Sequence, residues 1–301
     1  MTADPRRREE VVEETGETKL VRNANGALLR YWKDKSGTPE HVDFLVKDRE
    51  GWEKHIRPGL LDMSLDALRI PWEEYRWHRE LCSRNDLFLF WHSINVFECI
   101  HPICGHEHML IGMALDPDWV KDMCTVLADT TLRCQKLLFE REGVPDGIWY
   151  FEDMGFKERP FMSPAMYRDI VWPSHKLTFD YAHQIGCPVL VHSCGFVEPL
   201  VPDMIEAGMD CLQAIEVKAG MDLLRLKKRF GHQIALCGGL DVRALESNDL
   251  QQVEALLQAN LPTVMAGGGY IIHTDHSISR RVNYETYQYF RKRALEIGTY
   301  S

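Results

Sequence analysis

Residues Val189-Leu190-Val191-His192-Ser193-Cys194-Gly195 form the stretch of sequence that decides the fold. Pro188 and a helix-like segment precede this apolar run, so we expect a buried strand that ends in a loop. Side chains alternate between the two faces of a strand, which places His192 and Cys194 on one face, about 7 Å apart along the chain. An imidazole and a thiolate on one face can bind a single metal ion, usually zinc. The structural alternative is a small buried thiol beside a hydrogen-bonded histidine.

Length and composition restrict the class of protein. A chain of 301 residues can hold one large α/β barrel or two ordinary domains. Its formal charge is -10 and its basic residues are scattered, which argues against nucleic-acid binding and favours small molecules or proteins as partners. We expect no membrane association, because the sequence shows no signal peptide and no long apolar span. The nine cysteines follow no disulfide framework spacing, which indicates free thiols and a cytoplasmic location.

The first 84 residues are expected to form an N-terminal region of their own. Residues 1–20 are highly charged and predict a solvated leader or a short helix. The turn at residues 23–26 contains Asn-Gly and lies between two alternating runs, which indicates a β-hairpin. Residues 41–46 would add a third strand and complete a small meander. Residues 48–84 have a helical pattern.

Strand and helix patterns alternate from residue 85 to residue 301, which predicts parallel strands joined by right-handed crossovers. With six such units, a closed TIM-like (β/α)8 barrel is favoured over an open sheet. The strand count is two short of eight, so we expect a barrel that is incomplete at its N-terminus or is completed in another way. The predicted strands lie at residues 87–91, 147–151, 189–193, 210–215, 233–237 and 269–273.

Polar residues gather at the ends of these strands, and in a barrel the strand ends meet at one mouth. Packing alone has difficulty explaining histidines, cysteines and carboxylates from six strands on one rim, so we expect a metal or catalytic site there. Glu152 and Asp153 are the candidate catalytic acids, with helix capping or a solvated rim as the alternative. The candidate substrate-binding residues are Gln213, Glu216 and His92, although a structural role is the alternative for His92.

Three further motifs accompany the His192-Ser193-Cys194-Gly195 sequence. They are Ala207-Gly208-Met209-Asp210, Gly268-Gly269-Tyr270-Ile271 and Asp275-His276-Ser277-Ile278. With these motifs the sequence resembles the uroporphyrinogen decarboxylase superfamily, and within it the corrinoid (cobalamin)-dependent methyltransferase branch, over roughly residues 85–298. The resemblance implies a TIM-like barrel and a zinc ion held by a His-x-Cys pair and a later cysteine.

The resemblance assigns zinc ligands in this chain. His192 and Cys194 match the His-x-Cys pair, and His276 stands at the position of the later cysteine. Two imidazoles and one thiolate would leave the fourth zinc position open, as catalytic zinc requires. The decarboxylases of the superfamily hold no metal and also have a histidine there, so a hydrogen-bonding role for His276 is the alternative. Cys237 and His273 are reserve ligands.

The function that the resemblance implies is zinc-dependent methyl transfer between a small substrate and a corrinoid. The substrate would be a methyl ether, a methylamine or a thiol, and the sequence leaves the direction of transfer open. The corrinoid is expected on a separate carrier protein that docks over the barrel mouth. The Arg-rich loop of true decarboxylases is not recognisable in residues 1–84, which argues against tetrapyrrole decarboxylation. The alternatives are a metal-free lyase using Asp153 and His276, and a non-catalytic corrinoid- or tetrapyrrole-binding barrel.

Overall fold

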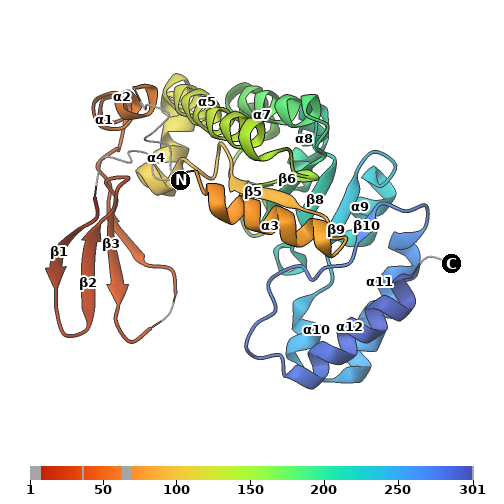
Figure 1. Ribbon diagram of the computed structural model, residues 1–301. Coiled ribbons are helices and arrows are strands. Elements are labelled where there is room, and N and C mark those ends of the chain that lie inside the picture. The colour runs from red at the N-terminus through yellow and green to blue at the C-terminus, as the bar shows by residue number, and fades with distance from the viewer. Residues whose placement is uncertain (1–7, 36, 63–69, 300–301) are drawn as a thin grey trace. The chain divides into compact units, whose positions relative to one another are not determined.

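The computed structural model describes residues 8–35, 37–62 and 70–299. The chain divides into two compact units, and Figure 1 labels most of their elements. The first unit contains Met1–Asp146 and Ala165–Cys187, and the second contains Gly147–Pro164 and Pro188–Ser301. The chain therefore passes between the units more than once. The single boundary expected after residue 84 stays a prediction.

An antiparallel sheet of four strands lies near the N-terminus, in the order β1 (Glu10–Glu14), β2 (Thr18–Arg22), β3 (Leu28–Trp32) and β4 (Glu40–Asp43). The predicted hairpin is confirmed, because β2 and β3 pair on either side of the turn that contains Gly26. The prediction of a solvated leader or short helix is wrong at β1. Its β-branched Val11 pairs with Val21, so this charged segment extends the sheet instead.

The remaining elements of the first unit are mainly helical. None of the helices in the part of the chain that the structure describes has the length and apolar composition needed to cross a bilayer. Helix α4 is interrupted at Gly105, whose φ is 76°. The position requires glycine, because a Cβ atom there would lie 2.5 Å from the Phe44 ring. The elements are α1 (Arg49–His55), α2 (Arg57–Leu61), α3 (Trp72–Arg84), β5 (Phe90–Ile94), α4 (His101–Leu115), α5 (Pro117–Glu142), α6 (Pro164–Met166), a π-helix (Tyr167–Val171) and α7 (Trp172–Gln184).

Five parallel strands form a sheet in the second unit, and their sequential order β10-β9-β8-β7-β6 means that each strand adds beside the previous one. Together with β5 they confirm the six strands predicted from the sequence. Strand β7 has the expected burial, since Val189, Leu190 and Val191 are at most 2% exposed. The strands are β6 (Gly147–Phe151), β7 (Val189–Ser193), β8 (Cys211–Ala214), β9 (Ala235–Gly238) and β10 (Tyr270–Ile271).

Helices alternate with these strands, which confirms the predicted α/β class. Asp222 begins α9 by accepting a hydrogen bond from the Arg225 amide at 2.8 Å, and Asp249 begins α11 in the same manner. The helices are α8 (Val201–Ala207), α9 (Leu223–Phe230), α10 (Val242–Glu246), α11 (Leu250–Met265) and α12 (Tyr284–Gly298). Short 3-10 helices at Glu198–Leu200 and Val217–Ala219 follow β7 and β8.

The register of the sheet aligns four side chains near the carboxyl ends of neighbouring strands. Phe151 pairs with His192, His192 with Gln213, and Gln213 with Cys237. Directly paired residues in a sheet point to the same face, so these four side chains form one row. We call them the strand-end row. Polar groups that are far apart in the sequence are therefore placed side by side.

Two glycines hold the loop after β6 against the loop after β7. A Cβ atom on Gly195 would lie 2.3 Å from the carbonyl carbon of Gly155, and Gly195 has a φ of +78°. The Phe196 amide also donates a hydrogen bond to the Phe156 carbonyl oxygen at 2.8 Å. This close approach needs glycine on both sides, because real Cβ atoms do not come so near to backbone atoms.

Replacing Gly195 by alanine is expected to destabilise the fold and to separate these loops. The left-handed backbone costs alanine about 1–2 kcal/mol, and displacing the Gly155 backbone costs roughly 1–3 kcal/mol more. The matched control is Gly267→Ala, because Gly267 has a similar φ of +75° but no atom within 4 Å of the added Cβ. Denaturant unfolding measures both variants, and equal losses of stability would contradict the close approach of the loops.

Candidate functional site

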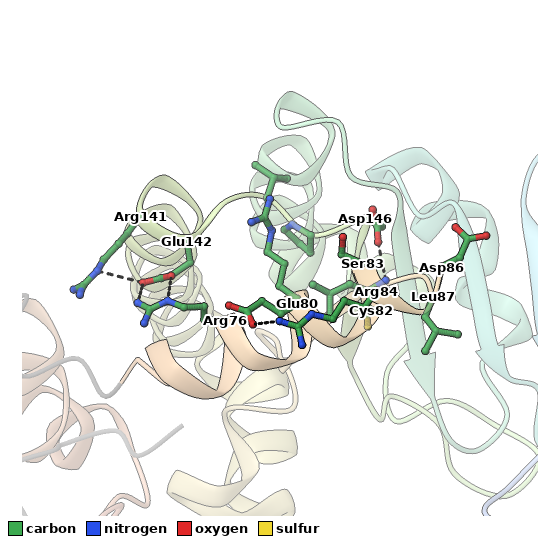
Figure 2. Close-up of a pocket in the computed structure, with 14 residues that line it drawn as sticks. Arg76, Glu80, Cys82, Ser83, Arg84, Asp86, Leu87, Arg141, Glu142 and Asp146 are labelled. Carbon is green, nitrogen blue, oxygen red and sulfur yellow. Dashed lines mark hydrogen bonds and ion pairs between the residues drawn. The ribbon is translucent and has the colours of Figure 1, made fainter.

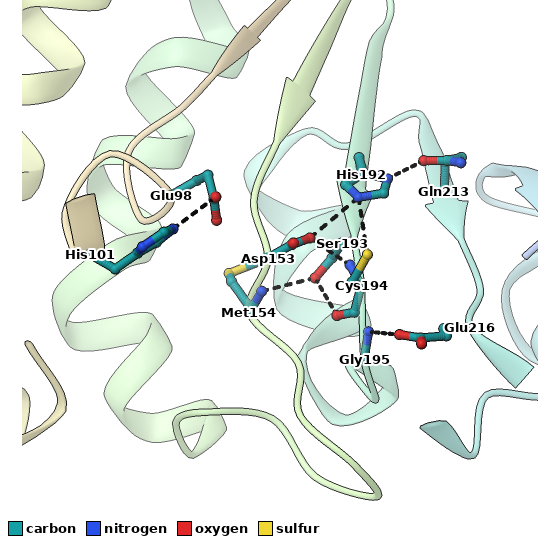
Figure 3. A network of polar contacts seen from close by, with 10 residues as sticks. All are labelled: Glu98, His101, Asp153, Met154, His192, Ser193, Cys194, Gly195, Gln213 and Glu216. Carbon is teal, nitrogen blue, oxygen red and sulfur yellow. Dashed lines mark hydrogen bonds and ion pairs between the residues drawn. The ribbon is translucent and has the colours of Figure 1, made fainter. Parts of the chain in front are cut away.

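Asp153, His192 and Cys194 bring a carboxylate, an imidazole and a thiol together in the second unit (Figure 3). We call these three residues the donor triad. One ligand atom from each lies within 4.8 Å of the others, and no second group of three such donors occurs in the described ranges. His192 Nε2 is 3.3 Å from Cys194 Sγ and 3.3 Å from Asp153 Oδ1. The predicted pairing of His192 with Cys194 on one face is therefore confirmed.

The strand register explains how Asp153 joins the pair. Phe151, the last residue of β6, lies opposite His192, so Asp153 lies in the loop that begins beside the carboxyl end of β7. The Cys194 amide donates a hydrogen bond to Asp153 Oδ1 at 2.7 Å, and the Met154 amide donates to Ser193 Oγ at 3.0 Å. The loops after β6 and β7 are thus joined directly at the donor triad.

Gln213 orients the imidazole of His192. Its side-chain oxygen Oε1 accepts a hydrogen bond from His192 Nδ1, its neighbour in the strand-end row. In the neutral imidazole this leaves the lone pair on Nε2, the nitrogen that faces Cys194 and Asp153. The structure gives Gln213 a positioning contact, and the substrate-binding role expected for it stays a prediction.

The surroundings of the donor triad favour a positive charge. Burial lowers the pKa of His192, but hydrogen bonds with Asp153, Cys194 and Gln213 outweigh this effect and raise the pKa to about 10. Burial raises the pKa of Asp153, but hydrogen bonds from His192 and the Cys194 amide lower it overall. Asp153 and Cys194 therefore stabilise the positively charged form of His192, and a metal ion bound at the donor triad would take the place of its Nε2 proton.

Two of the three spacings within the donor triad are close to those of zinc ligands, and the third, between Asp153 and Cys194, is within 4.8 Å. Two ligand atoms of a tetrahedral zinc ion lie roughly 3.3–3.6 Å apart, given the usual zinc–nitrogen, zinc–oxygen and zinc–sulfur bond lengths. The two distances from His192 Nε2 are both 3.3 Å. Nitrogen, sulfur and carboxylate oxygen are all common zinc donors. Three such donors would leave one position of the metal open.

The predicted third ligand does not join the donor triad in the described structure. Strand β10 ends at Ile271, two residues before the end predicted from the sequence. His276 lies in the loop that follows and is exposed. His273 hydrogen-bonds the Thr274 carbonyl oxygen through Nδ1 at 2.6 Å. The second reserve residue, Cys237, is buried two strands away from β7, and burial raises the pKa of its thiol to about 12. The third donor is instead Asp153, which the sequence had indicated as a catalytic acid.

The other predicted residues take different places. Glu152 is fully buried, and its backbone amide donates to the His192 carbonyl oxygen at 2.8 Å. Glu216 accepts a hydrogen bond from the Gly195 amide at 2.6 Å and pairs with Lys218 at 3.0 Å, so it supports the loop that follows Cys194. His92 lies on β5, in the first unit. The catalytic role of Glu152 and the substrate contacts of Glu216 and His92 stay predictions.

Asp275 has a structural role that the sequence did not indicate, although the residue belongs to one of the motifs quoted above. Its side chain is almost completely buried and accepts hydrogen bonds from the Val242 amide at 2.8 Å and the Val217 amide at 3.0 Å. Burial raises its pKa. Asp275 thus ties the loop after β8 to the start of α10. No local pattern could indicate this role, because both partners are backbone amides far away in the sequence.

A cavity of about 810 Å³ lies within the first unit, beside α3 (Figure 2). Two of its acidic groups are engaged by its own arginines, since Glu142 pairs with Arg76 at 2.6 Å and with Arg141 at 3.3 Å, and Glu80 pairs with Arg84. It contains none of the predicted site residues. We therefore place the candidate site at the donor triad and not in this larger cavity.

Comparison with known proteins identifies relatives of this chain. A methylated-thiol–coenzyme M methyltransferase of Methanosarcina mazei is 30% identical over 87 residues, which make up 29% of this chain and 22% of that protein. The solved structure of a methyltransferase from Methanosarcina mazei superimposes with a TM-score of 0.64 and 14% identity, covering 91% of this chain and 76% of that one. At this identity the likeness concerns the fold alone, and it confirms the predicted TIM-like α/β barrel class.

The family assignment rests on a longer match. Residues 100–296 match the family described as uroporphyrinogen decarboxylase (URO-D). That range contains β6 to β10 and the whole donor triad. The chain therefore belongs to the uroporphyrinogen decarboxylase (URO-D) family.

Proposed function

We propose that this chain is a zinc-dependent methyltransferase that moves a methyl group between a small heteroatom substrate and a corrinoid. The donor triad is the observation that carries this proposal, because it gathers nitrogen, sulfur and oxygen donors within 4.8 Å of one another. The similarity to a methylated-thiol–coenzyme M methyltransferase of Methanosarcina mazei supports the reaction class. In this proposal Asp153 takes the ligand position that the sequence had led us to assign to His276.

The residues around the donor triad would prepare it for the metal. Gln213 holds His192 through Nδ1, so that Nε2 faces the metal position. The Cys194 amide holds the Asp153 carboxylate, and Glu216 holds the next amide, that of Gly195. Because the ligands are already fixed, little conformational entropy would be lost on metal binding. One thiolate and one carboxylate would balance the two positive charges of zinc.

The open position of the metal is the proposed place of the substrate heteroatom. Zinc held by the donor triad would supply a Lewis acid that draws electron density from an ether oxygen or amine nitrogen, or keeps a thiol ionised near neutral pH. Because the side chains of the donor triad would fix the metal at the strand ends, the heteroatom bound to the metal would also have a fixed place there. Among the expected substrates, thiols and methylated thiols are the class that the name of the relative supports.

The corrinoid part of the proposal rests on the resemblance to corrinoid-dependent methyltransferases. We propose that a separate carrier protein presents the corrinoid at the carboxyl ends of the strands, where the donor triad lies. The metal-free lyase using Asp153 and His276 has less support, because His276 does not lie with Asp153 in the donor triad. A non-catalytic corrinoid-binding barrel is the remaining alternative, which the assay below distinguishes.

Metal analysis tests the ligand set. Purified protein incubated with zinc and dialysed is expected to keep one zinc per chain, and Cys194→Ala and Asp153→Ala are expected to keep much less, because each loses a ligand. Gln213→Leu should bind zinc roughly 10–100-fold more weakly, since the imidazole loses its orienting partner. Cys82→Ala is the control, because it removes a thiol on α3, in the first unit, outside the donor triad.

The same measurement includes His276→Ala. This variant is expected to bind zinc as the unaltered chain does. Loss of zinc in His276→Ala with full binding in Asp153→Ala would contradict the proposed donor triad and restore the ligand set expected from the sequence.

A spectroscopic assay tests the reaction. The zinc-loaded chain is mixed with cob(I)alamin and a panel of methylated thiols, amines and aromatic ethers, and the appearance of methylcobalamin is followed by its absorbance. We expect turnover with at least one donor class and a rate at least roughly tenfold lower in Asp153→Asn. Turnover that survives complete zinc removal would contradict the role of the metal. The non-catalytic alternative would be favoured if the chain binds cobalamin but transfers methyl in neither direction. In that case no donor methylates cob(I)alamin, and methylcobalamin does not methylate thiols.

A further inference from the structure

A second pocket lies at the carboxyl ends of the strands in the second unit. Its volume is about 490 Å³, and it is formed by the loops after β6, β7 and β8 together with α9. Phe196 and Pro199 supply apolar walls, and Glu158, Glu198, Arg225 and Arg229 supply charge. None of the donor triad lines it.

Glu198 is the centre of this pocket's charge. It is only 5% exposed, and it pairs with two guanidinium groups. Arg225 Nε and Nη2 donate to Glu198 Oε2 at 2.8 and 2.6 Å, and Arg229 Nη1 donates to Oε1. One buried carboxylate therefore faces two guanidinium groups, and Glu158 supplies the second negative charge of the lining.

The guanidinium of Arg229 retains donors for a ligand. Within the described residues, no hydrogen bond engages its Nε or Nη2, and its side chain is 51% exposed. One face of the group lies over the Phe230 ring at 4.8 Å. The Nη1 group of Arg225 forms an ion pair with Asp222 at 3.9 Å, which is beyond hydrogen-bonding distance. The pocket thus presents N–H groups that protein acceptors do not satisfy.

The two arginines are one helical turn apart on α9, so their side chains lie on the same face. The buried carboxylate of Glu198 holds both guanidinium groups in place. Long side chains normally lose rotational freedom when they bind a ligand, and this cost is smaller when they are already held. Planar guanidinium groups recognise carboxylate and phosphate oxygens through paired hydrogen bonds.

We propose that Arg225 and Arg229 form a binding site for the oxyanion group of a small molecule, either a carboxylate or a phosphate. The apolar walls formed by Phe196 and Pro199 would contact the rest of the ligand. The site is independent of the donor triad and of methyl transfer. It nevertheless shares a segment with the triad, because Phe196 lies two residues after Cys194.

A purely structural ion pair is the alternative for this cluster. Glu198 and the two arginines also join the 3-10 helix Glu198–Leu200 to α9, which would stabilise the fold without any ligand. The two roles differ in their response to Glu158, which lines the pocket without a described ion pair. Removing its negative charge should strengthen binding of an anion, whereas the structural role predicts no binding to strengthen.

Isothermal titration calorimetry with the full-length chain at low salt tests the site. The probes are inorganic phosphate and malonate, and the tighter of the two identifies the class of oxyanion. We expect saturable binding, a loss of at least roughly tenfold in affinity for Arg229→Gln, and a gain of roughly twofold to fivefold for Glu158→Gln. Circular dichroism confirms that each variant is folded.

The matched control is Arg243→Gln. Arg243 is similarly exposed and also pairs with a carboxylate, that of Asp241 at 2.7 Å, but it does not line the pocket. It is expected to bind the probes as the unaltered chain does. The proposal is overturned if neither probe binds saturably, if Arg243→Gln weakens binding as much as Arg229→Gln, or if Glu158→Gln weakens it. If Arg229→Gln does not fold, the Glu158→Gln comparison still decides.

Discussion

The parallel register of β6, β7 and β8 is the constraint on which the candidate site depends. It sets Phe151, His192 and Gln213 side by side. Gln213 can therefore hydrogen-bond His192, and Asp153, which follows Phe151 by two residues, comes close to His192. The glycine contact between the loops after β6 and β7 then fixes how close Asp153 and Cys194 come. Backbone geometry, rather than any single side-chain interaction, brings the three donors together.

The sequence predicted the parts of the site that depend on local periodicity. His192 and Cys194 are expected on one face because side chains alternate along a strand. This expectation needs no knowledge of the neighbouring strands. Asp153 could be placed at a strand end, but its distance from Cys194 depends on the register between two strands and on a glycine contact, and neither is written in a local pattern. The expected ligand His276 came from a family position, and the early end of β10 leaves it in an exposed loop.

The strands with clear apolar runs were predicted correctly, whereas the strand that consists mostly of charged residues was not. All six strands from β5 to β10 were predicted, because their apolar runs are bounded by turn residues. Strand β1 was missed, since three of its five residues are glutamates and all five are exposed. Its pairing with β2 is a non-local interaction that composition does not reveal. The structural roles of the buried carboxylates Asp275, Glu198 and Glu216 were likewise not predicted, because their partners lie on segments far away in the sequence.

The central claim is that one ion binds His192, Cys194 and Asp153 together. Zinc K-edge X-ray absorption spectroscopy of the loaded protein tests this most directly, since it reads the atoms bound to the metal. The donor triad predicts one sulfur neighbour at about 2.3 Å and otherwise nitrogen or oxygen neighbours at about 2.0–2.2 Å. A coordination shell with no sulfur, or with two or more, would contradict the account.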